Sequence, residues 1–535
     1  MPLLPELDDL SLAEQVAQMV VVRASGYLFD HQIQYPSWEP TADKLQHWLQ
    51  DLAIGGVILL GGSAGEIALR SQQLQDWAKI PLLMAADIEE GVGQRFAGAT
   101  WFPPPMAIAA IARQVSHKAE DYAKQIGAYT AQEALAIGLN WVLAPVVDIN
   151  NNPDNPVINV RAFGETPAEV SQLATAFIHG AQQYPVLTTA KHFPGHGDTA
   201  TDSHLELPVL SHSQVRLAEI ELPPFAAAIA AGVDAVMSAH LQIPTLDPDY
   251  PATLSQRILT GELRHQLGFG GLIVTDALVM GAIANRYGAN TAPVMALAAG
   301  ADILLMPIDP EGAIQAICEA VETGQISAER IRASVERIWR AKQKVCSLRL
   351  DESSSRHAWE KLPSPPIQLA QLAQPDALAC AANILQDALL TQGKIVQSWD
   401  NPCNMIVLDN LLGCDFLDRQ APAIALPAKL GYQQLQIVDR HTPDVQVELE
   451  NWQPTLLQLF IRGNPFRGSA GLNQKAKDWF HFLATRQQLQ ALVIYGSPYI
   501  LEQFLPQLPP GVPYAFTYGQ MPIAQAIALA ALFDL

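Results

Sequence analysis

The segment KHFPGHGDTATDSH, Lys191–His204, concentrates groups that can transfer protons or bind ligands. It holds three histidines, two aspartates and a lysine within fourteen residues, and its glycines and proline predict an irregular loop. Asp202 and His204 stand two residues apart, so a turn would let the carboxylate hold one ring nitrogen and raise the basicity of the other. Such a histidine can protonate a leaving oxygen and then deprotonate water. We therefore interpret the segment as a catalytic loop with Asp202 and His204 as its acid/base pair.

Two other interpretations of this loop stay open. His192, His196 and His204 offer three nitrogen ligands for zinc, but a lysine adjoins the first histidine and the spacing matches no familiar zinc-binding helix. The loop could also be a polar surface segment without a ligand. We favour the catalytic interpretation over both, and we expect neither a metal nor another cofactor.

A second candidate group is Asp276, in the sequence GGLIVTDALVM. Five largely apolar residues deliver this single carboxylate to the end of an expected strand, where it could attack an anomeric carbon and form a glycosyl-enzyme. The alternative is that Asp276 caps the N-terminus of the next helix. Position alone does not separate the two. Asp87 raises the same question, because it follows the apolar run PLLMAA and opens a glycine-containing loop that ends at Arg95.

The elements that must position these residues alternate between short apolar strands and longer helical patterns. Several strand candidates are almost continuously apolar, as parallel strands covered on both faces should be. The eight candidates are Met19–Val22, Gly56–Leu60, Leu82–Ala86, Trp141–Val147, Leu187–Lys191, Ala235–Ala239, Gly271–Thr275 and Asp302–Met306. Helical stretches between them include Ser116–Ile137, Pro167–Gln182 and Ser213–Ala231. This rhythm predicts an α/β fold with a (β/α)8 TIM-like barrel, in which the candidate residues share the rim at the strand carboxyl ends. An open doubly wound sheet is the competing arrangement.

The rhythm breaks around Leu348–Pro366, which contains consecutive serines and the run Pro-Ser-Pro-Pro. Strand patterns then resume at Met405–Leu408, Thr455–Ile461 and Ala491–Tyr495. We therefore predict a catalytic barrel over 1–347, a linker over 348–366 and a smaller C-terminal α/β sandwich domain over 367–535.

Composition narrows the class of protein. The 535 residues are 49% hydrophobic and 16% charged, and the formal net charge is −21. Nucleic-acid binding needs a basic surface, so we expect no nucleic-acid partner. No apolar stretch reaches membrane-spanning length and the N-terminus lacks a signal pattern, so we expect no membrane association. The five cysteines match no metal-binding spacing, and reduced thiols in a cytoplasmic protein are the expectation.

Three motifs together resemble glycoside hydrolase family 3, in its β-N-acetylhexosaminidase branch. They are Lys191–Pro208, similar to the catalytic loop, Pro145–Glu165, similar to the arginine loop, and Ile273–Ile283, similar to the nucleophile segment. The resemblance covers most of residues 5–345. It implies a retaining exo-β-N-acetylglucosaminidase that acts through a covalent glycosyl-enzyme, with Asp276 as nucleophile and His204, oriented by Asp202, as acid/base. It also implies that five residues bind hydroxyls of the terminal sugar: Asp87, Arg95, Arg161, Lys191 and His192.

The resemblance has departures and leaves alternatives. The loop after the third strand commonly reads D-x-E-G-G-R-V-x-R, but Glu90 here replaces a glycine and Val92 an arginine. A β-glucosidase or β-xylosidase of the same family and a non-catalytic carbohydrate-binding barrel remain competing functions. The implied partner is a small saccharide derived from recycled cell wall or from chitin, and the protein would be a monomer or a homodimer. The second domain offers no catalytic motif, and we interpret it as a packing or dimerising domain that closes one side of the cleft.

Overall fold

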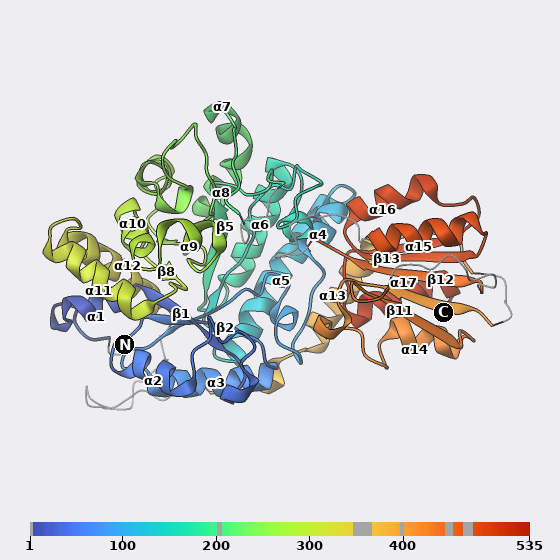
Figure 1. Cartoon of the computed structure of the whole chain (residues 1–535), viewed down its shortest axis with the longest axis horizontal. Coiled ribbons are helices and arrows are strands. Elements are labelled where there is room, and N and C mark those ends of the chain that lie inside the picture. The colour runs from blue at the N-terminus through green and yellow to red at the C-terminus, as the bar shows by residue number, and fades with distance from the viewer. Residues whose placement is uncertain (1–3, 201–205, 346–365, 396–400, 444–452, 464–473) are drawn as a thin grey trace.

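The computed structural model describes residues 4–200, 206–345, 366–395, 401–443, 453–463 and 474–535. Its first part is a barrel of parallel strands inside a layer of helices, and a smaller sheet domain follows (Figure 1). The barrel strands are β1 (Val20–Ser25), β2 (Gly56–Leu60), β3 (Leu83–Ala86), β4 (Trp141–Val142), β5 (Leu187–Phe193), β6 (Ala235–Ser238), β7 (Leu272–Val274) and β8 (Leu304–Leu305). Each overlaps one of the eight apolar runs, so the expected fold class is confirmed.

The barrel closes on itself, which excludes the open-sheet alternative. Parallel neighbours run in the order β7-β6-β5-β4-β3-β2-β1-β8. The two ends of this order meet through a parallel bridge between Val274 and Ile303. There the Ile303 amide donates to the Ile273 carbonyl at 3.1 Å, and the Thr275 amide donates to the Ile303 carbonyl at 3.0 Å. The carboxyl ends of all eight strands therefore share one rim.

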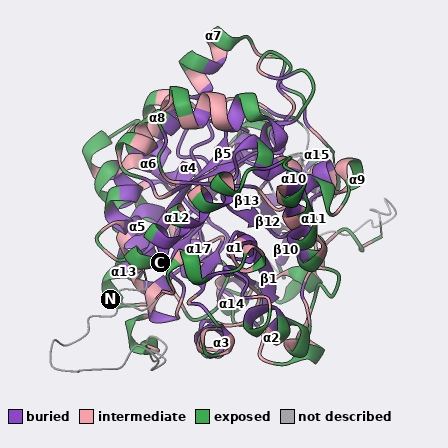
Figure 2. Cartoon of the chain, turned by 90° about the vertical axis from the view of Figure 1, so that its left-hand side faces the viewer, coloured by how far each residue is buried: buried purple, intermediate pink, exposed green. Residues whose placement is uncertain are grey.

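Helices cover the outside of the barrel. They are α1 (Leu12–Ala17), α2 (Ala42–Gln50), α3 (Ala64–Trp77), α4 (Pro105–Ala112), α5 (Ser116–Ala136), α6 (Pro167–Ala181), α7 (Gln214–Arg216), α8 (Pro223–Ala230), α9 (Gly281–Tyr287), α10 (Thr291–Ala299), α11 (Pro310–Glu322) and α12 (Ala328–Val345). The local sequence determines where several of these helices begin. Thr166 and Glu169, for example, form a capping box at the start of α6, with Pro167 in the first turn. Figure 2 shows buried strands within this helical layer, whose outer faces are exposed.

The helix expected over Ser213–Ala231 is instead divided. The chain forms the short α7, then a π-helical turn over Leu217–Glu221, and then α8. The reason lies in Pro223 and Pro224, which lack backbone N–H donors and so cannot continue the hydrogen-bond ladder of a preceding helix. A second π-helical segment covers Arg257–Gln266.

The second domain is built on a six-stranded sheet. Its strands are β9 (Leu390–Gln392), β10 (Cys403–Val407), β11 (Gln434–Val438), β12 (Thr455–Ile461), β13 (Leu489–Gly496) and β14 (Tyr514–Thr517), in the order β11-β10-β12-β13-β14-β9. Among these described strands, β9 runs antiparallel to β14 and the other neighbours are parallel. The helices are α13 (Pro375–Asp387), α14 (Pro422–Lys429), α15 (Gln474–Thr485), α16 (Pro498–Phe504) and α17 (Pro522–Phe533). The expected second α/β domain is therefore present.

The two domains contact each other along α5 and α13 (Figure 1). Tyr122 and Lys118 of α5 reach Asp387 of α13, at 2.7 Å from the tyrosine hydroxyl and 2.6 Å from the lysine Nζ. The predicted linker at 348–366 lies almost wholly outside the described residues, so the domain limits 1–347 and 367–535 stay predictions. Within the described residues, no helix combines the length and apolarity needed to cross a bilayer.

Candidate active site

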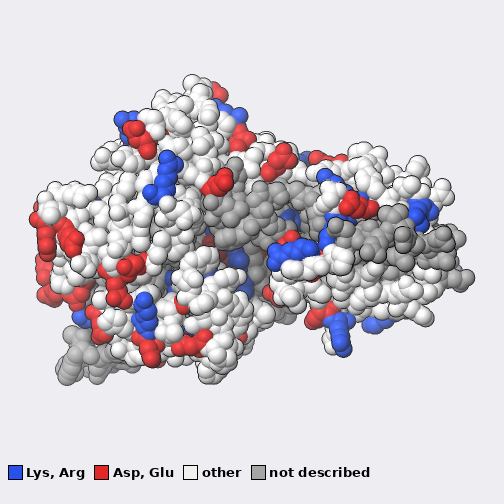
Figure 3. All heavy atoms as spheres, viewed as in Figure 1, with Lys and Arg blue, Asp and Glu red and all other residues white. Residues whose placement is uncertain are grey.

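A cavity of about 920 Å³ opens where the barrel strands end, beside the second domain. Its walls carry residues from β1 and from the segments after β1, β3, β4, β5 and β7, and also residues after β10 and β12. Figure 3 shows Lys and Arg atoms recessed in the hollow between the two domains. Because active sites of (β/α)8 barrels lie at this face, the cavity is the candidate active site.

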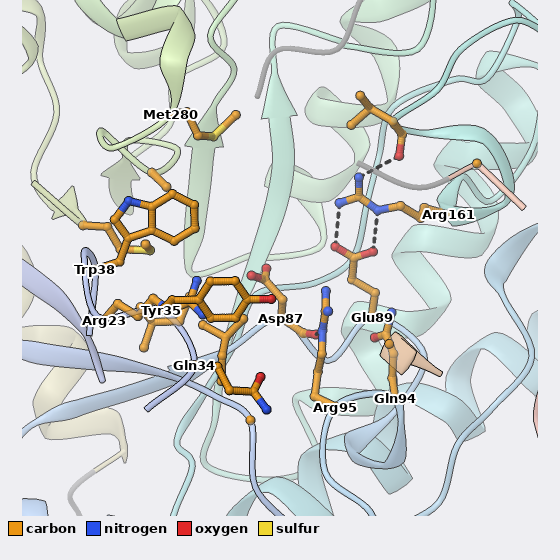
Figure 4. Close-up of a pocket in the computed structure, with 18 of the residues that line it drawn as sticks. Arg23, Gln34, Tyr35, Trp38, Asp87, Glu89, Gln94, Arg95, Arg161 and Met280 are labelled. Carbon is orange, nitrogen blue, oxygen red and sulfur yellow. Dashed lines mark hydrogen bonds and ion pairs between the residues drawn. The ribbon is translucent and has the colours of Figure 1, made fainter. Parts of the chain in front are cut away.

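Glu89 is the centre of a charged cluster on one wall (Figure 4). Nε and Nη2 of Arg161 donate to the two Glu89 carboxylate oxygens, each at 2.8 Å. The Lys191 Nζ lies 2.6 Å from Glu89 Oε1 and donates to Asp87 Oδ1 at 2.7 Å. Three of the expected sugar-binding residues thus gather around a carboxylate that the sequence analysis did not select.

Burial and charge act in opposite directions on this cluster. The side chains of Lys191 and Glu89 are only 1% and 2% exposed. Burial alone would raise the pKa of Glu89, but the charges of Arg161 and Lys191 hold it well below its ordinary value. Burial would likewise lower the pKa of Lys191, yet the charges of Asp87 and Glu89 raise it. Glu89 and Lys191 therefore stay ionised at neutral pH and form a fixed set of charges.

Asp148 holds the start of the loop after β5, which the sequence predicts to be catalytic. Its buried carboxylate lies 2.7 Å from His192 Nδ1 and also accepts hydrogen bonds from the backbone amides of His192 and His196. Burial would raise the pKa of Asp148, but the two histidines lower it. The charged carboxylate fixes the orientation of the His192 ring, and His192 lines the cavity.

Asp276 lines the same cavity directly after β7. The alternative interpretation, that it caps the next helix, is wrong. Met280 is the N-cap of α9, and the Asp276 carboxylate instead accepts a hydrogen bond from the amide of Ala277 at 2.8 Å. The Asp276 amide donates to the Ser238 carbonyl of β6 at 3.2 Å, so the barrel itself holds the residue at the rim. Asp276 also lies close enough to His196 for its charge to act on that ring.

Asn155 ties the loop after β4 to the catalytic loop after β5. Its Nδ2 donates to the carbonyls of His196 and Gly197, both at 2.9 Å, and its Oδ1 accepts from the amides of Val157 and Ile158. The two loops are in such close contact that a Cβ at Gly197 would overlap the carbonyl oxygen of Ile149. These contacts hold the loop after β5 as far as Thr199. Asp202 and His204 lie outside the described residues.

The zinc interpretation receives no support from the residues that can be placed. Nδ1 of His192 contacts Asp148 and Nδ1 of His196 contacts Thr199 Oγ1 at 2.8 Å, so both rings have a protein partner on that side. Burial lowers the pKa of His196 to about 4. Within the described ranges, no group of three or more histidine, cysteine or acidic side chains is arranged to hold a metal ion. His204, the third expected ligand, lies outside these ranges.

The departures from the family pattern in the loop after β3 have a structural counterpart. Glu90, which replaces a glycine, is 0% exposed and pairs with Arg462 of the second domain at 2.6 Å. Its Oε2 also accepts a hydrogen bond from Trp101 Nε1 at 3.0 Å. Val92, which replaces an arginine, is buried. Arg95 keeps its expected place in the cavity wall and donates from Nε to the Asp87 carbonyl at 2.9 Å.

Comparison with known proteins agrees with this geometry. The profile of the glycosyl hydrolase family 3 N terminal domain matches residues 11–341. The chain belongs to this family. The profile of the bacterial glycosyl hydrolase family 3 C-terminal domain matches residues 395–534. The family expected from the sequence is therefore confirmed for both parts of the chain.

Individual relatives point to the expected branch. Beta-hexosaminidase A of Pseudoalteromonas piscicida is 36% identical over 333 residues, which are 56% of this chain and 55% of that protein. A Beta-N-acetylglucosaminidase/beta-glucosidase of Cellulomonas fimi is 31% identical over 65% of this chain and 60% of its own length. The chain thus spans less than two thirds of either relative. The structure of a glycoside hydrolase family 3 beta-N-acetylglucosaminidase from Paenibacillus sp. str. FPU-7 superposes with a TM-score of 0.79 at 28% identity, over 98% of this chain and 97% of that one.

The cavity brings together most of the residues selected from the sequence. Asp276 and all five expected sugar-binding residues line it, namely Asp87, Arg95, Arg161, Lys191 and His192. Glu89, Asp148 and Asn155 were not among the residues predicted from the sequence. Asp148 and Asn155 belong to the motif Pro145–Glu165, and Glu89 occupies the acidic position of the D-x-E pattern. The motifs that indicated the family therefore already included all three residues.

Proposed function

We propose that the protein is a retaining exo-β-N-acetylhexosaminidase that removes terminal N-acetylglucosamine. The observation that carries the proposal is the joint placement of Asp276 and the Glu89-centred cluster in one cavity. A carboxylate can attack an anomeric carbon, and the cluster offers charged donors and acceptors for sugar hydroxyls. The similarity to Beta-hexosaminidase A and to the Paenibacillus beta-N-acetylglucosaminidase supports the choice of sugar.

The proposed roles follow the positions of the residues. Asp276 forms the covalent glycosyl-enzyme, while His204, held by Asp202, protonates the leaving oxygen and then activates water. Asp87, Arg95, Arg161, Lys191 and His192 bind the hydroxyls of the terminal sugar. Burial of Lys191 and His192 favours action on a chain end, because a hydroxyl must enter deeply to reach them. His196 is a poor candidate for the proton donor, since its lowered pKa keeps it neutral at pH 7.

The stereochemical course tests the role of Asp276. Double displacement through a covalent intermediate gives a product that first appears as the β-anomer in a time-resolved NMR experiment. Asp276→Asn removes the nucleophile and should abolish hydrolysis, while the variant still binds N-acetylglucosamine. An initial α-anomer would refute the retaining mechanism. A fully active Asp276→Asn variant would refute the assignment of the nucleophile.

The choice of sugar has its own test. A panel of 4-nitrophenyl β-glycosides should give the highest kcat/KM with the N-acetylglucosaminide. The alternative is a β-glucosidase or β-xylosidase of the same family, and it is favoured by the double name of the Cellulomonas fimi relative. A higher kcat/KM with the glucoside or xyloside would select this alternative. Hydrolysis of none of them would favour a non-catalytic carbohydrate-binding barrel.

The acid/base assignment is tested by the leaving group. His204→Ala should lower kcat/KM by about 10²–10⁴-fold for poor leaving groups, which need a proton as the bond breaks. Activated aryl groups depart without one, so their loss should be smaller. Equal losses with both kinds of substrate would contradict the assignment of His204.

We further propose that the enzyme acts in the cytoplasm on saccharide fragments from recycled cell wall or from chitin. Among the described residues, Cys318, Cys380, Cys403 and Cys414 are free thiols, which suits a reducing compartment. Fractionation of the source cells should find the activity in the cytosol. Activity confined to the periplasm or the medium would contradict this location.

A further inference from the structure

An aromatic wall stands on a part of the cavity rim that the proposed roles leave unused. Tyr35 and Trp38 follow β1 and both line the cavity. Their rings are nearly parallel, with centroids 5.8 Å apart and an interplanar angle of 13°. Tyr35 is 49% exposed, which is unusual for an aromatic residue inside a concave, charged site. Tyrosine and tryptophan rings offer a broad apolar surface with a polar group at the edge.

A buried ion pair holds this wall in place. The guanidinium of Arg23, on β1, lies over both rings, at 4.7 Å from the Tyr35 centroid and 5.4 Å from that of Trp38. Glu39 neutralises it, with Oε1 at 2.8 Å from Nε and 2.6 Å from Nη2. The second Glu39 oxygen accepts from the Tyr35 amide at 3.4 Å. The aromatic pair is therefore fixed before any ligand arrives, which lowers the entropic cost of binding.

The position of the wall indicates which part of a substrate it would meet. The hydroxyl-binding cluster comes from the loops after β3, β4 and β5, and Asp276 follows β7, whereas β1 belongs to the remaining sector between β8 and β2. In Figure 4, Tyr35 lies across the pocket from Glu89 and Arg161, and Met280 and Trp38 stand on the same side. A nucleophile attacks the anomeric carbon opposite the departing oxygen, so the leaving group points away from the Asp276 carboxylate.

We infer that Tyr35 and Trp38 form a binding subsite for the leaving group, and that its occupant is an uncharged second pyranose ring. A pyranose presents a face of C–H groups to an aromatic ring, and the Arg23–Glu39 pair leaves the wall without net charge. This inference rests on the proposed exo-glycosidase function and adds the substrate class: the enzyme prefers a β-linked oligosaccharide to a glycoside with a small leaving group.

The test compares two substrates that differ only in the leaving group, N,N′-diacetylchitobiose and N-acetyl-β-glucosaminyl fluoride. Both give the same glycosyl-enzyme, so the ratio of their kcat/KM values reports contacts made by the leaving group alone. Tyr35→Ala and Trp38→Leu should each lower the ratio of disaccharide to fluoride by roughly tenfold. Phe29→Ala is the matched control: this aromatic residue stands in the same loop, is 61% exposed and does not line the cavity. It should leave the ratio unchanged.

Each outcome decides the question. Equal losses on both substrates would mean that the wall supports the fold or the terminal sugar, and an unchanged ratio would mean that the leaving group does not touch it. Either result overturns the subsite. Turnover of the fluoride by each variant shows that the variant is folded. Failure of the unmodified protein to hydrolyse either substrate would instead refute the proposed function, so the two failures are distinguishable.

Discussion

Glu89 shows how a single carboxylate can set the charge of a binding site. Two cations, Arg161 and Lys191, lie against it in a region from which water is largely excluded. A buried charge without a partner is costly, so each cation depends on this shared anion. Lys191 also pairs with Asp87. In the bidentate contact with Arg161, both carboxylate oxygens come from Glu89. The orientation of Arg161 therefore depends mainly on Glu89.

The first prediction at the residue scale follows from this dependence. Glu89→Gln keeps the shape of the side chain but removes its charge, so we expect the free energy of unfolding to fall by about 3 kcal/mol. Displacement of Arg161 should also lower kcat/KM by about a hundredfold. Urea unfolding and steady-state kinetics measure the two effects. Glu336→Gln, which breaks an exposed pair with Arg332 on α12, is the control and should change neither by much. A Glu89→Gln variant with normal activity would contradict the assigned role.

His196 gives a prediction for pH. Burial lowers its pKa from 6.5 to about 4, so the unfolded chain binds a proton more readily than the folded one between these values. The stability contributed by neutral His196 is therefore present above about pH 6.5 and is lost as the pH falls. Between pH 7 and pH 5 the loss should be about 2 kcal/mol. Urea unfolding at the two pH values should show this difference, and His196→Asn should reduce it.

His117 provides the matched control, because it is exposed on α5 and distant from the catalytic loop in sequence. His117→Asn should leave the pH dependence of unfolding as it is. If His196→Asn retains the full difference between pH 7 and pH 5, other groups are responsible for it and the role given to His196 is wrong.

At the scale of elements, the sequence was most informative where strands are buried on both faces. β1, β2, β3 and β5 are apolar or fully buried throughout, and their runs stood out against the flanking turns. β9, β11 and β14 of the second domain were not predicted. β14 is mostly buried but only four residues long, whereas β9 is exposed along its length and β11 is fully buried only at its end. Without burial there is no apolar pattern for a sequence analysis to detect.

The same reasoning explains which parts of the site were missed. The aromatic residues after β1 stand in an irregular segment, where no periodicity separates a binding wall from an ordinary loop. Asp148 and Asn155 act through backbone amides and carbonyls of a distant loop, and such contacts follow from the three-dimensional path of the chain. Catalytic candidates at strand ends were easier to find, because the barrel fold itself predicts their location.

A prediction at this scale concerns the hydrogen bonds of Asn155 between the loop after β4 and the loop after β5. Asn155→Ala removes the hydrogen bonds that hold the catalytic loop to the loop after β4. Because the proposed proton donor, His204, lies farther along that loop, we expect kcat/KM to fall by about a hundredfold for poor leaving groups and by less for activated ones. Asn152→Ala is the control, since among the described residues the Asn152 Oδ1 contact is with the amide of Asp154 in the same loop. An equal loss for both kinds of leaving group would mean that the Asn155 hydrogen bonds do not position the proton donor.

At the scale of the whole molecule, the second domain does more than pack against the barrel. Arg462 reaches Glu90, and Tyr499 donates to Glu165 at 2.6 Å while accepting from Asn150 at 2.9 Å. These contacts fall on the loops after β3 and β4, which carry Asp87, Arg95 and Arg161, three of the residues proposed to bind the sugar. Phe416, Phe460 and Arg462 also line the cavity. The second domain therefore lines one side of the cavity, and it also supports the loops after β3 and β4.

Variants of the Glu90–Arg462 pair can measure how strongly the second domain supports the loop after β3. Glu90 is wholly buried, so Arg462→Met leaves an unpaired charge in the loop after β3, and we expect the free energy of unfolding to fall by about 3–5 kcal/mol. The double variant Glu90→Gln, Arg462→Met removes both charges and should recover much of that loss, since a buried pair can often be replaced by neutral groups. Arg419→Met, at an exposed position in the same domain, is the control and should have little effect.

The kinetics of these variants separate a structural role from a positioning role. If the pair only joins the domains, Arg462→Met will lower stability and leave kcat/KM unchanged at temperatures where the protein is folded. If it positions the loop after β3, KM will rise as well, because Asp87, Glu89 and Arg95 all lie within five residues of Glu90. We expect the second result, with the double variant restoring stability more than KM, because a neutral pair lacks the charge-assisted hydrogen bonds that orient the loop. Restoration of both to the same extent would show that the contact acts through stability alone.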